Sequence, residues 1–199
     1  MPRPQPVEIQ AHAIDNLRYI RRTIERAGSF TAVPGAGGAV MGSLALLAAW
    51  VAGPEGRPSI AVRWLAVWMA AALVAVAVGV AAAALKSRRA GLPLLSGPGR
   101  KFVAGFAPAM LAGGLLTFVL FQAGEGALLP GVWILLYGAG VVSGGSASVR
   151  IVPLMGACFM AAGAIALLLP QADANAMLAA GFGGLHIVFG FVIAVKYGG

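Results

Sequence analysis

His186 is the side chain in this sequence that is best placed to do chemistry. It lies near the middle of an apolar stretch at 174–195, and ionisable residues at such a depth in a membrane are usually functional. Gly183 and Gly190 flank it at i−3 and i+4, which predicts a flat surface beside the imidazole. That surface suits either a packed helix or a planar tetrapyrrole. Axial ligation of haem or chlorophyll by His186 is therefore one hypothesis, and a neutral histidine hydrogen-bonded to another helix is the alternative.

Tyr137 is a candidate partner for His186. When the sequence is shifted by 49 residues, the apolar stretches within 102–147 align with those within 151–195, and Tyr137 falls opposite His186. This alignment indicates a possible duplication of a helical hairpin. It also places the two side chains at a similar depth, so we expect that they can form a hydrogen bond.

A second group of polar residues follows the fourth apolar stretch. Ser143 and Ser146 lie in a serine- and glycine-rich segment that ends close to Arg150. Backbone N–H groups of such a turn can bind an anion, and the arginine would add positive charge. The competing interpretation is a plain turn at the membrane surface. The sequence leaves open whether 143–148 is helix or loop.

The polar residues do not predict a catalytic or metal site. Ser146 is expected at one end of its helix and His186 near the centre of another, which is too far apart for a Ser–His pair. Cys158 is the single cysteine, and the methionines show no helical pairing with His or Cys. All the acidic residues lie outside the apolar stretches, which argues against proton-coupled transport. They are Glu8, Asp15, Glu25, Glu55, Glu125 and Asp173.

Apolar stretches along most of the chain must position these residues. The chain is 60% hydrophobic and 10% charged, whereas soluble domains are about 25% charged. The apolar stretches cover 35–52, 61–85, 102–123, 127–147, 151–169 and 174–195. Each is close to the length of about 20 residues with which a helix crosses a bilayer. The sequence therefore predicts an all-α polytopic membrane protein with a six-helix transmembrane bundle at 35–199, and Pro108 can kink the third helix.

The charges predict how this bundle is oriented. Of the 14 Lys and Arg residues, all but Arg57 and Arg63 fall on one side of the predicted membrane. The rule that cytoplasmic loops are rich in Lys and Arg then places both termini in the cytoplasm. The four tryptophans fall near the opposite ends of their stretches, where this side chain favours the membrane interface. The net charge of +8 is thus explained without a nucleic-acid partner, and the Ala-, Gly- and Arg-rich composition suggests a bacterial cytoplasmic membrane.

Residues 1–34 predict an arm at the inner membrane surface. Ala13, Leu17, Ile20 and Ile24 fall on one face of a helix, and basic residues lie mostly off that face. Such an amphipathic helix typically lies on an anionic leaflet, and the competing hypothesis is a docking helix for a cytoplasmic protein. The basic residues expected to contact lipid headgroups or a partner are Arg18, Arg21, Arg22, Arg26, Lys86, Arg88, Arg89, Arg100 and Lys101.

The expected function is non-enzymatic: an accessory, scaffold or regulatory subunit that acts with other membrane subunits or as a homo-oligomer, with no cofactor. Small-residue faces offer helix contacts for this role, at Gly38/Gly42, Gly140/Gly144 and Gly183/Gly190, although the same faces can close the bundle on itself. An enzyme acting on a lipid or peptide near His186 is a third possibility. The alternative is a small transporter or channel, which a water-accessible groove would favour. Its candidate pathway residues are Pro108, Tyr137, Ser143, Ser146, Arg150 and His186.

Overall fold

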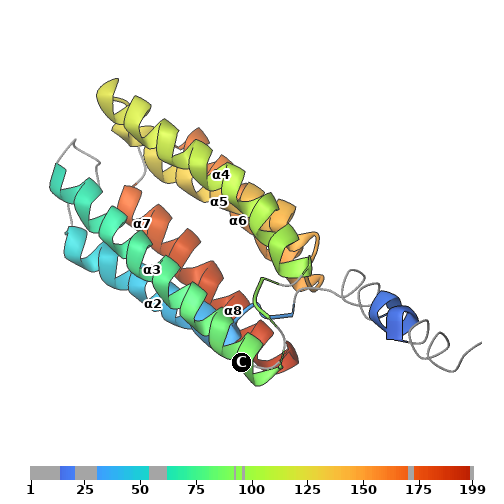
Figure 1. Cartoon of the computed structure of the whole chain (residues 1–199). Coiled ribbons are helices and arrows are strands. Elements are labelled where there is room, and N and C mark those ends of the chain that lie inside the picture. The colour runs from blue at the N-terminus through green and yellow to red at the C-terminus, as the bar shows by residue number, and fades with distance from the viewer. Residues whose placement is uncertain are drawn as a thin grey trace, which may run out of the picture.

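The protein is a bundle of long helices. A computed structural model describes residues 14–20, 31–53, 62–91, 93–95, 97–169 and 173–197. Within these residues, six helices are long and apolar enough to cross a membrane, which confirms the predicted all-α six-helix bundle and fits a multi-pass membrane protein. They are α2 (Gly35–Ala52), α3 (Val62–Arg89), α4 (Gly97–Gln122), α5 (Leu129–Gly145) after the short turn η1 (Gly126–Leu128), α6 (Ile151–Leu168), and a last helix made of α7 (Ala174–Leu178), the wide turn η2 (Ala179–Leu185) and α8 (His186–Tyr197) (Figure 1).

Some helices end at other residues than the predicted apolar stretches do, and these differences occur at charged residues or glycines. α3 continues through its basic residues to Arg89, because positive side chains in a last turn interact favourably with the helix dipole. α5 ends at Gly145, so the segment 143–148 is partly helix and partly turn. α4 continues through Pro108 as one helix. At the N-terminus, residues 14–20 are helical and exposed, while the rest of the predicted amphipathic helix lies outside the described residues.

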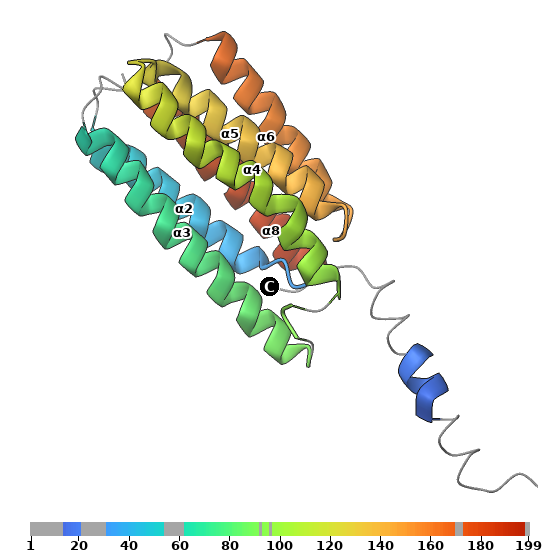
Figure 2. The same cartoon turned by 45° about the horizontal axis from the view of Figure 1, so that its top comes forward.

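The helices form two groups. In the first group, α2 packs against both α3 and α8. In the second group, α5 packs between α4 and α6. Figures 1 and 2 show these groups lying side by side, with the last helix along the seam between them. The predicted hairpin duplication is therefore wrong, because α4 packs on its sequence neighbour α5 whereas α8 packs on α2 rather than closely on α6.

Glycines set the close approach of helices within each group. A Cβ atom on Gly156 of α6 would lie 2.6 Å from the backbone nitrogen of Val142 of α5. A Cβ atom on Gly42 of α2 would lie 2.6 Å from the carbonyl oxygen of Gly183. Small residues let helix backbones meet in this way in membranes. The predicted small-residue faces thus close the bundle on itself, and the same holds for Gly144, which packs on Phe102 of α4.

One end of the bundle gathers the start of α2, the end of α3 and the end of α8. Nζ of Lys86 donates hydrogen bonds to the carbonyl oxygens of Val33, at 3.0 Å, and Tyr197, at 3.1 Å. The two ends of the bundle's chain therefore lie on the same side, which agrees with an even number of crossings. That this side is cytoplasmic stays a prediction.

The opposite end is held by tryptophans and Asn175. Trp64 and Trp68 are 6% and 4% exposed, and both donate their indole N–H to Oδ1 of Asn175, at 2.9 and 3.1 Å. Nδ2 of Asn175 donates to the carbonyl oxygen of Gly53 at 2.8 Å. Trp64 and Trp68 thus lie at the end of the bundle where the sequence predicts them, but they are buried and join α3, α7 and the end of α2. Trp50 is 79% exposed, as an interfacial tryptophan requires.

Candidate functional site

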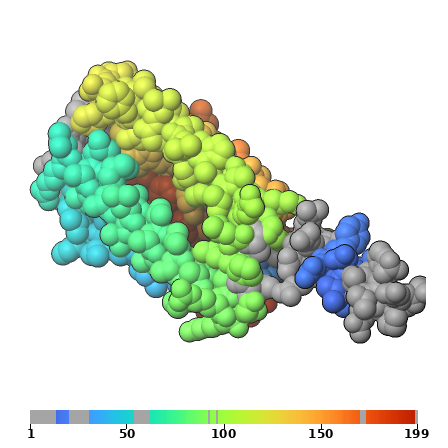
Figure 3. Space-filling view, in the orientation of Figure 1, coloured from blue at the N-terminus to red at the C-terminus, as the bar shows by residue number. Residues whose placement is uncertain are grey.

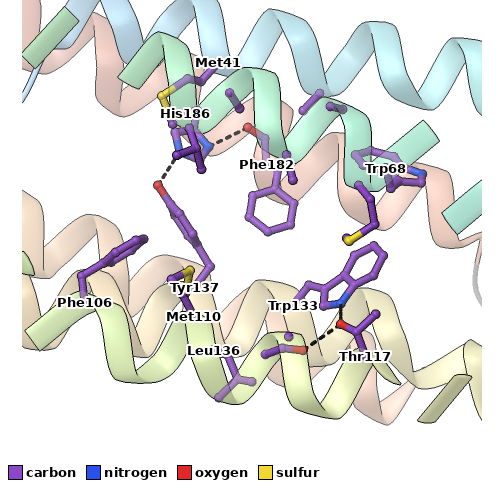
Figure 4. A pocket seen from close by; sticks show the side chains of 18 residues that line it. Met41, Trp68, Phe106, Met110, Thr117, Trp133, Leu136, Tyr137, Phe182 and His186 are labelled. Carbon is purple, nitrogen blue, oxygen red and sulfur yellow. Dashed lines mark hydrogen bonds between the residues drawn. The ribbon is translucent and has the colours of Figure 1, made fainter. Parts of the chain in front are cut away.

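Tyr137 and His186 form a buried polar pair between the two helix groups. Tyr137 comes from the middle of α5, and His186 is the first residue of α8. The Tyr137 hydroxyl lies 2.7 Å from Nε2 of His186, as the expected contact requires, and the histidine is 4% exposed (Figure 4). The hydrogen bond therefore links the second group to the last helix of the first.

The wide turn η2 precedes His186 and supplies the carbonyl oxygen that orients its ring. The sequence of η2 is Ala-Ala-Gly-Phe-Gly-Gly-Leu, and wide turns of this kind inside helices are frequent at functional sites. The backbone N–H of His186 donates to the carbonyl oxygen of Gly183 rather than to that of Phe182. The Phe182 carbonyl oxygen instead lies 2.8 Å from Nδ1 of His186. Both ring nitrogens of the histidine are thus hydrogen-bonded, which fixes the plane of the imidazole.

Aromatic rings hold Tyr137 in place. Its ring meets the rings of Phe106, Phe159 and Phe182 edge to face, with centroids 5.7, 4.9 and 5.3 Å apart. Phe159 is fully buried and also packs against the imidazole of His186, at 5.0 Å. Such edge-to-face pairs are favourable beyond the area that they bury. The pair is therefore rigidly positioned by α4, α6 and η2.

A cavity of about 340 Å³ lies beside this pair. We call it the α3–α4 cavity, because these helices form its two side walls. The space-filling view shows this face of the molecule hollowed between α3 and α4, with the last helix visible at the bottom (Figure 3). The lining residues are Met41 and Ala45 of α2; Trp68, Met69, Ala71, Ala72, Ala75 and Val76 of α3; Phe106, Met110, Gly113, Gly114 and Thr117 of α4; Trp133, Leu136 and Tyr137 of α5; and Phe182 and His186.

Small side chains account for the open space. The wall from α3 is rich in alanine, and the wall from α4 carries Gly113 and Gly114 on the same helix face as Phe106 and Met110. A Cβ atom on Gly114 would meet nothing within 4 Å. The hollow between α3 and α4 therefore results from the alanines of α3 and the glycines of α4 that face it.

The polar atoms on the cavity wall are few and already hydrogen-bonded. The hydroxyl of Thr117 donates to the carbonyl oxygen of Gly113 at 2.7 Å and accepts from Nε1 of Trp133 at 2.8 Å. Figure 4 also shows the Tyr137–His186 pair and Trp68 around the cavity, and the indole N–H of Trp68 donates to Oδ1 of Asn175. Among the described residues, none that lines the cavity is Asp, Glu, Lys or Arg. The site can therefore hold an uncharged, largely apolar molecule.

The structure separates the predicted pathway residues. Tyr137 and His186 line the cavity, whereas Pro108, Ser143, Ser146 and Arg150 do not.

The Ser143–Arg150 segment has the contacts of a plain turn. The hydroxyl of Ser146 donates to the carbonyl oxygen of Ser143 at 2.7 Å. The backbone N–H groups of Ser146, Ala147 and Ser148 donate to carbonyl oxygens of the preceding turn. These three N–H groups are engaged within the chain, which favours the plain turn over the anion cradle.

The glycines beside His186 serve helix packing. A Cβ atom on Gly183 would meet the side chain of Leu46, and one on Gly190 would lie 2.6 Å from the backbone nitrogen of Ala39. Of the two expected occupants of this flat surface, the structure places a helix there, namely α2. A tetrapyrrole ligated by His186 would have to displace both α2 and the Tyr137 hydroxyl.

The predicted contact residues for lipid headgroups or a partner fall into two sets. Lys86, Arg88, Arg89, Arg100 and Lys101 lie at the end of the bundle where α3 ends and α4 begins. Arg18 lies in the exposed helical segment 14–20 and pairs with Asp15 at 3.6 Å. Arg21, Arg22 and Arg26 lie outside the described residues.

Several site residues escaped prediction. Asn175 is the acceptor for two buried tryptophans, and the i, i+4 spacing of Trp64 and Trp68 was a signal that both N–H groups need a shared partner. Thr117 was not singled out either. The methionines looked scattered in the sequence, yet three of them, on α2, α3 and α4, line one cavity. In the part of the chain that is described, no three His, Cys, Asp or Glu residues are grouped to hold a metal ion.

Comparison of this chain with protein-family models, with curated proteins and with solved structures gave no significant match.

Proposed function

We propose that this protein binds a lipophilic molecule inside the membrane, in the α3–α4 cavity beside the Tyr137–His186 pair. The observation that carries this proposal is the cavity itself, an apolar hollow of about 340 Å³ with one buried polar pair at its wall. Ligand sites are typically concave and mostly apolar, with volumes of roughly 300–1,000 Å³ and a few placed polar groups. The α3–α4 cavity has all of these properties.

The surroundings of the cavity define the ligand's route. The outer faces of both wall helices carry exposed apolar residues, among them Leu73 and Val80 on α3 and Leu111 and Leu115 on α4. In a bilayer these faces contact lipid, so the hollow between them opens sideways toward the acyl chains. A lipophilic molecule can then move from the bilayer into the site without crossing water.

The volume sets the size of the ligand. A cavity of about 150 Å³ holds benzene, so one of 340 Å³ holds roughly a dozen carbon atoms. A single alkyl chain of that length, or an equivalent portion of a larger lipid, fits this space.

We infer a non-enzymatic role, as an accessory or regulatory membrane protein whose state depends on ligand occupancy. The side chains of Thr117, Tyr137 and His186 are held by hydrogen bonds to protein partners, which suits binding better than proton transfer or attack. The small-residue faces no longer support a scaffold role, since they pack inside the bundle. The inferred role therefore rests on the cavity and not on the small-residue faces.

A transporter or channel is supported less well. Four of its six candidate pathway residues, Pro108, Ser143, Ser146 and Arg150, do not line the cavity. The cavity wall is apolar, whereas an aqueous pathway needs polar groups that can replace the water around a solute.

We further propose a location in a bacterial cytoplasmic membrane with both termini inside. The basic residues at the Lys86–Lys101 end would then face anionic lipid headgroups, and the arm before α2 would lie on the same leaflet. Other membrane subunits, a second copy of this chain or a cytoplasmic protein on the arm remain its proposed partners.

Quenching of tryptophan fluorescence by a brominated alkane tests ligand binding. Trp68 and Trp133 line the cavity, and Trp64 stacks on Trp133 with centroids 5.5 Å apart. The exposed Trp50 is first replaced by Phe, so that quenching from bulk lipid is reduced. We expect bromododecane, added to protein in nanodiscs, to quench saturably in this Trp50→Phe background.

Two variants in that background locate the quenching. Gly114→Phe places a ring in the cavity and should remove the saturable part, because nothing lies within 4 Å of a Cβ atom there. Ala112→Phe adds the same ring on the exposed face of α4, away from the cavity, and should leave the saturable part intact. Quenching that rises linearly and equally in all three proteins would show that no site exists.

A further inference from the structure

The carbonyl oxygen of Phe182 determines where the protons of the Tyr137–His186 pair lie. A carbonyl oxygen only accepts, so the atom 2.8 Å from it, Nδ1 of His186, must carry a hydrogen. The imidazole is buried, and in the described part of the chain no carboxylate lines the cavity, which favours the neutral ring. In a neutral ring with Nδ1 protonated, Nε2 is an acceptor. The Tyr137 hydroxyl, 2.7 Å away, therefore donates to Nε2.

This arrangement leaves the Tyr137 oxygen as an acceptor. Its one hydrogen is committed to His186, while its oxygen can still accept a hydrogen bond. The Thr117 hydroxyl likewise has its hydrogen on the carbonyl of Gly113, and Trp133 has its N–H on Thr117. The polar side chains on the cavity wall therefore have their hydrogens in use, and what they offer a ligand is oxygen.

The lack of charged side chains on the described cavity wall excludes ionic ligands. None of the lining residues that the structure describes is Asp, Glu, Lys or Arg, so a carboxylate or phosphate would enter without a cation, and an ammonium group without an anion. Burying an unpaired charge costs far more than burying a neutral polar group. A ligand that matches this wall is uncharged and carries its own hydrogen-bond donor.

We propose that the α3–α4 cavity selects a neutral lipophilic alcohol, whose hydroxyl donates to the Tyr137 oxygen while its hydrocarbon part fills the space between α3 and α4. This ligand class rests on the proposed function, since it names the occupant of the same site. The shared chemistry is the hydroxyl donor on a flexible chain, so fatty and isoprenoid alcohols belong to one class. Ethers, esters and fatty acids of the same chain do not.

Competition against bromododecane tests this selection. Dodecanol, dodecyl methyl ether and dodecanoate are compared for how well they displace bromododecane from the Trp50→Phe protein. The mole fraction of each competitor in the nanodisc lipid is measured by chromatography. A neutral hydrogen bond contributes about 0.5–1.5 kcal/mol, and about 1.4 kcal/mol is tenfold in affinity. We therefore expect dodecanol to displace the probe at roughly three- to tenfold lower mole fraction than its methyl ether, and dodecanoate to compete least.

Tyr137→Phe combined with His186→Phe assigns the preference to the Tyr137 oxygen, because in Tyr137→Phe alone Nε2 of His186 would accept from the alcohol in its place. In the double variant the advantage of alcohol over ether should shrink to less than about twofold, while bromododecane still binds. Equal competition by alcohol and ether in the parent protein, or a preference that survives in the double variant, would overturn the proposal. The parent comparison decides even where the variant does not fold. Absence of saturable bromododecane quenching would instead remove the proposed function itself, so the two failures are distinguishable.

Discussion

The phenol oxygen of Tyr137 lies 2.7 Å from Nε2 of His186, although 49 residues separate them and each belongs to a different helix group. The contact is made in an interior where both partners are packed among phenylalanine rings. It joins the two groups at the cavity wall, so it bears on both stability and ligand choice.

Tyr137→Phe should destabilise the bundle. His186 Nε2 would lose its donor in a buried place, and an unsatisfied buried acceptor costs about 1–3 kcal/mol, while measured hydrogen bonds between membrane helices average about 0.6 kcal/mol. We expect a loss of about 1 kcal/mol, seen as a lower thermal midpoint in detergent. Tyr197→Phe is the matched control, because it removes the same hydroxyl from a residue that is 40% exposed. Equal midpoints for the two variants would contradict this role of the pair.

His186 should be neutral, with its hydrogen on Nδ1. Nitrogen NMR of protein labelled in histidine can distinguish the two ring nitrogens, and a His12→Ala variant leaves His186 as the only histidine. The Phe182 carbonyl, 2.8 Å from Nδ1, dictates this tautomer. A spectrum with the hydrogen on Nε2 would reverse the donor and acceptor along the pair. The Tyr137 oxygen would then have a hydrogen to donate, and the cavity would no longer prefer alcohols.

Asn175→Ala should loosen the tryptophan end of the bundle. The change removes the acceptor of two indole N–H groups and the donor to Gly53, each bond contributing about 0.5–1.5 kcal/mol. We expect a loss of about 1–3 kcal/mol in stability and a red shift of tryptophan emission. Ser43→Ala is the control, since its hydroxyl bonds only to Ala39 on its own exposed helix face. If Asn175→Ala and Ser43→Ala behave alike, Asn175 does not hold α3.

Gly156→Ala should destabilise the bundle, whereas Gly114→Ala should leave its stability unchanged or raise it. The new methyl group on Gly156 would lie 2.6 Å from the backbone of Val142 and force α5 and α6 apart, at a cost of about 1–3 kcal/mol. On Gly114 the methyl group enters open space, and replacing a helical glycine by alanine gains up to about 1 kcal/mol. Thermal unfolding of the two variants checks this opposite sign. A stabilised Gly156→Ala protein would refute the close packing of α5 on α6.

The fold was predictable from hydropathy, because lipid requires each crossing helix to be apolar over its length. The close packing of helices was visible in glycine spacing, yet spacing alone did not reveal that Gly42 meets Gly183 rather than a partner protein. The Tyr137–His186 contact was expected from the sequence shift, although the duplication behind that shift is not present in the helix packing.

The cavity could not be predicted, since it depends on which helix faces meet. In the sequence, Ala71 and Ala72 are indistinguishable from other apolar residues of a membrane helix. They line a cavity only because α3 and α4 lie apart in the structure. Asn175 was overlooked for a related reason. Its partners, Trp64 and Trp68, lie on a helix more than one hundred residues earlier, and nothing local to Asn175 indicates them.

Photolabelling with a diazirine derivative of dodecanol, followed by mass spectrometry of the adducts, tests the central claim most directly. The account predicts adducts on cavity-lining residues such as Ala72, Met110 and Thr117, and their suppression by excess dodecanol and by Gly114→Phe. Adducts confined to lipid-facing residues such as Leu111 and Phe118, and undiminished by excess dodecanol, would contradict the claim that this protein holds a lipophilic alcohol between α3 and α4.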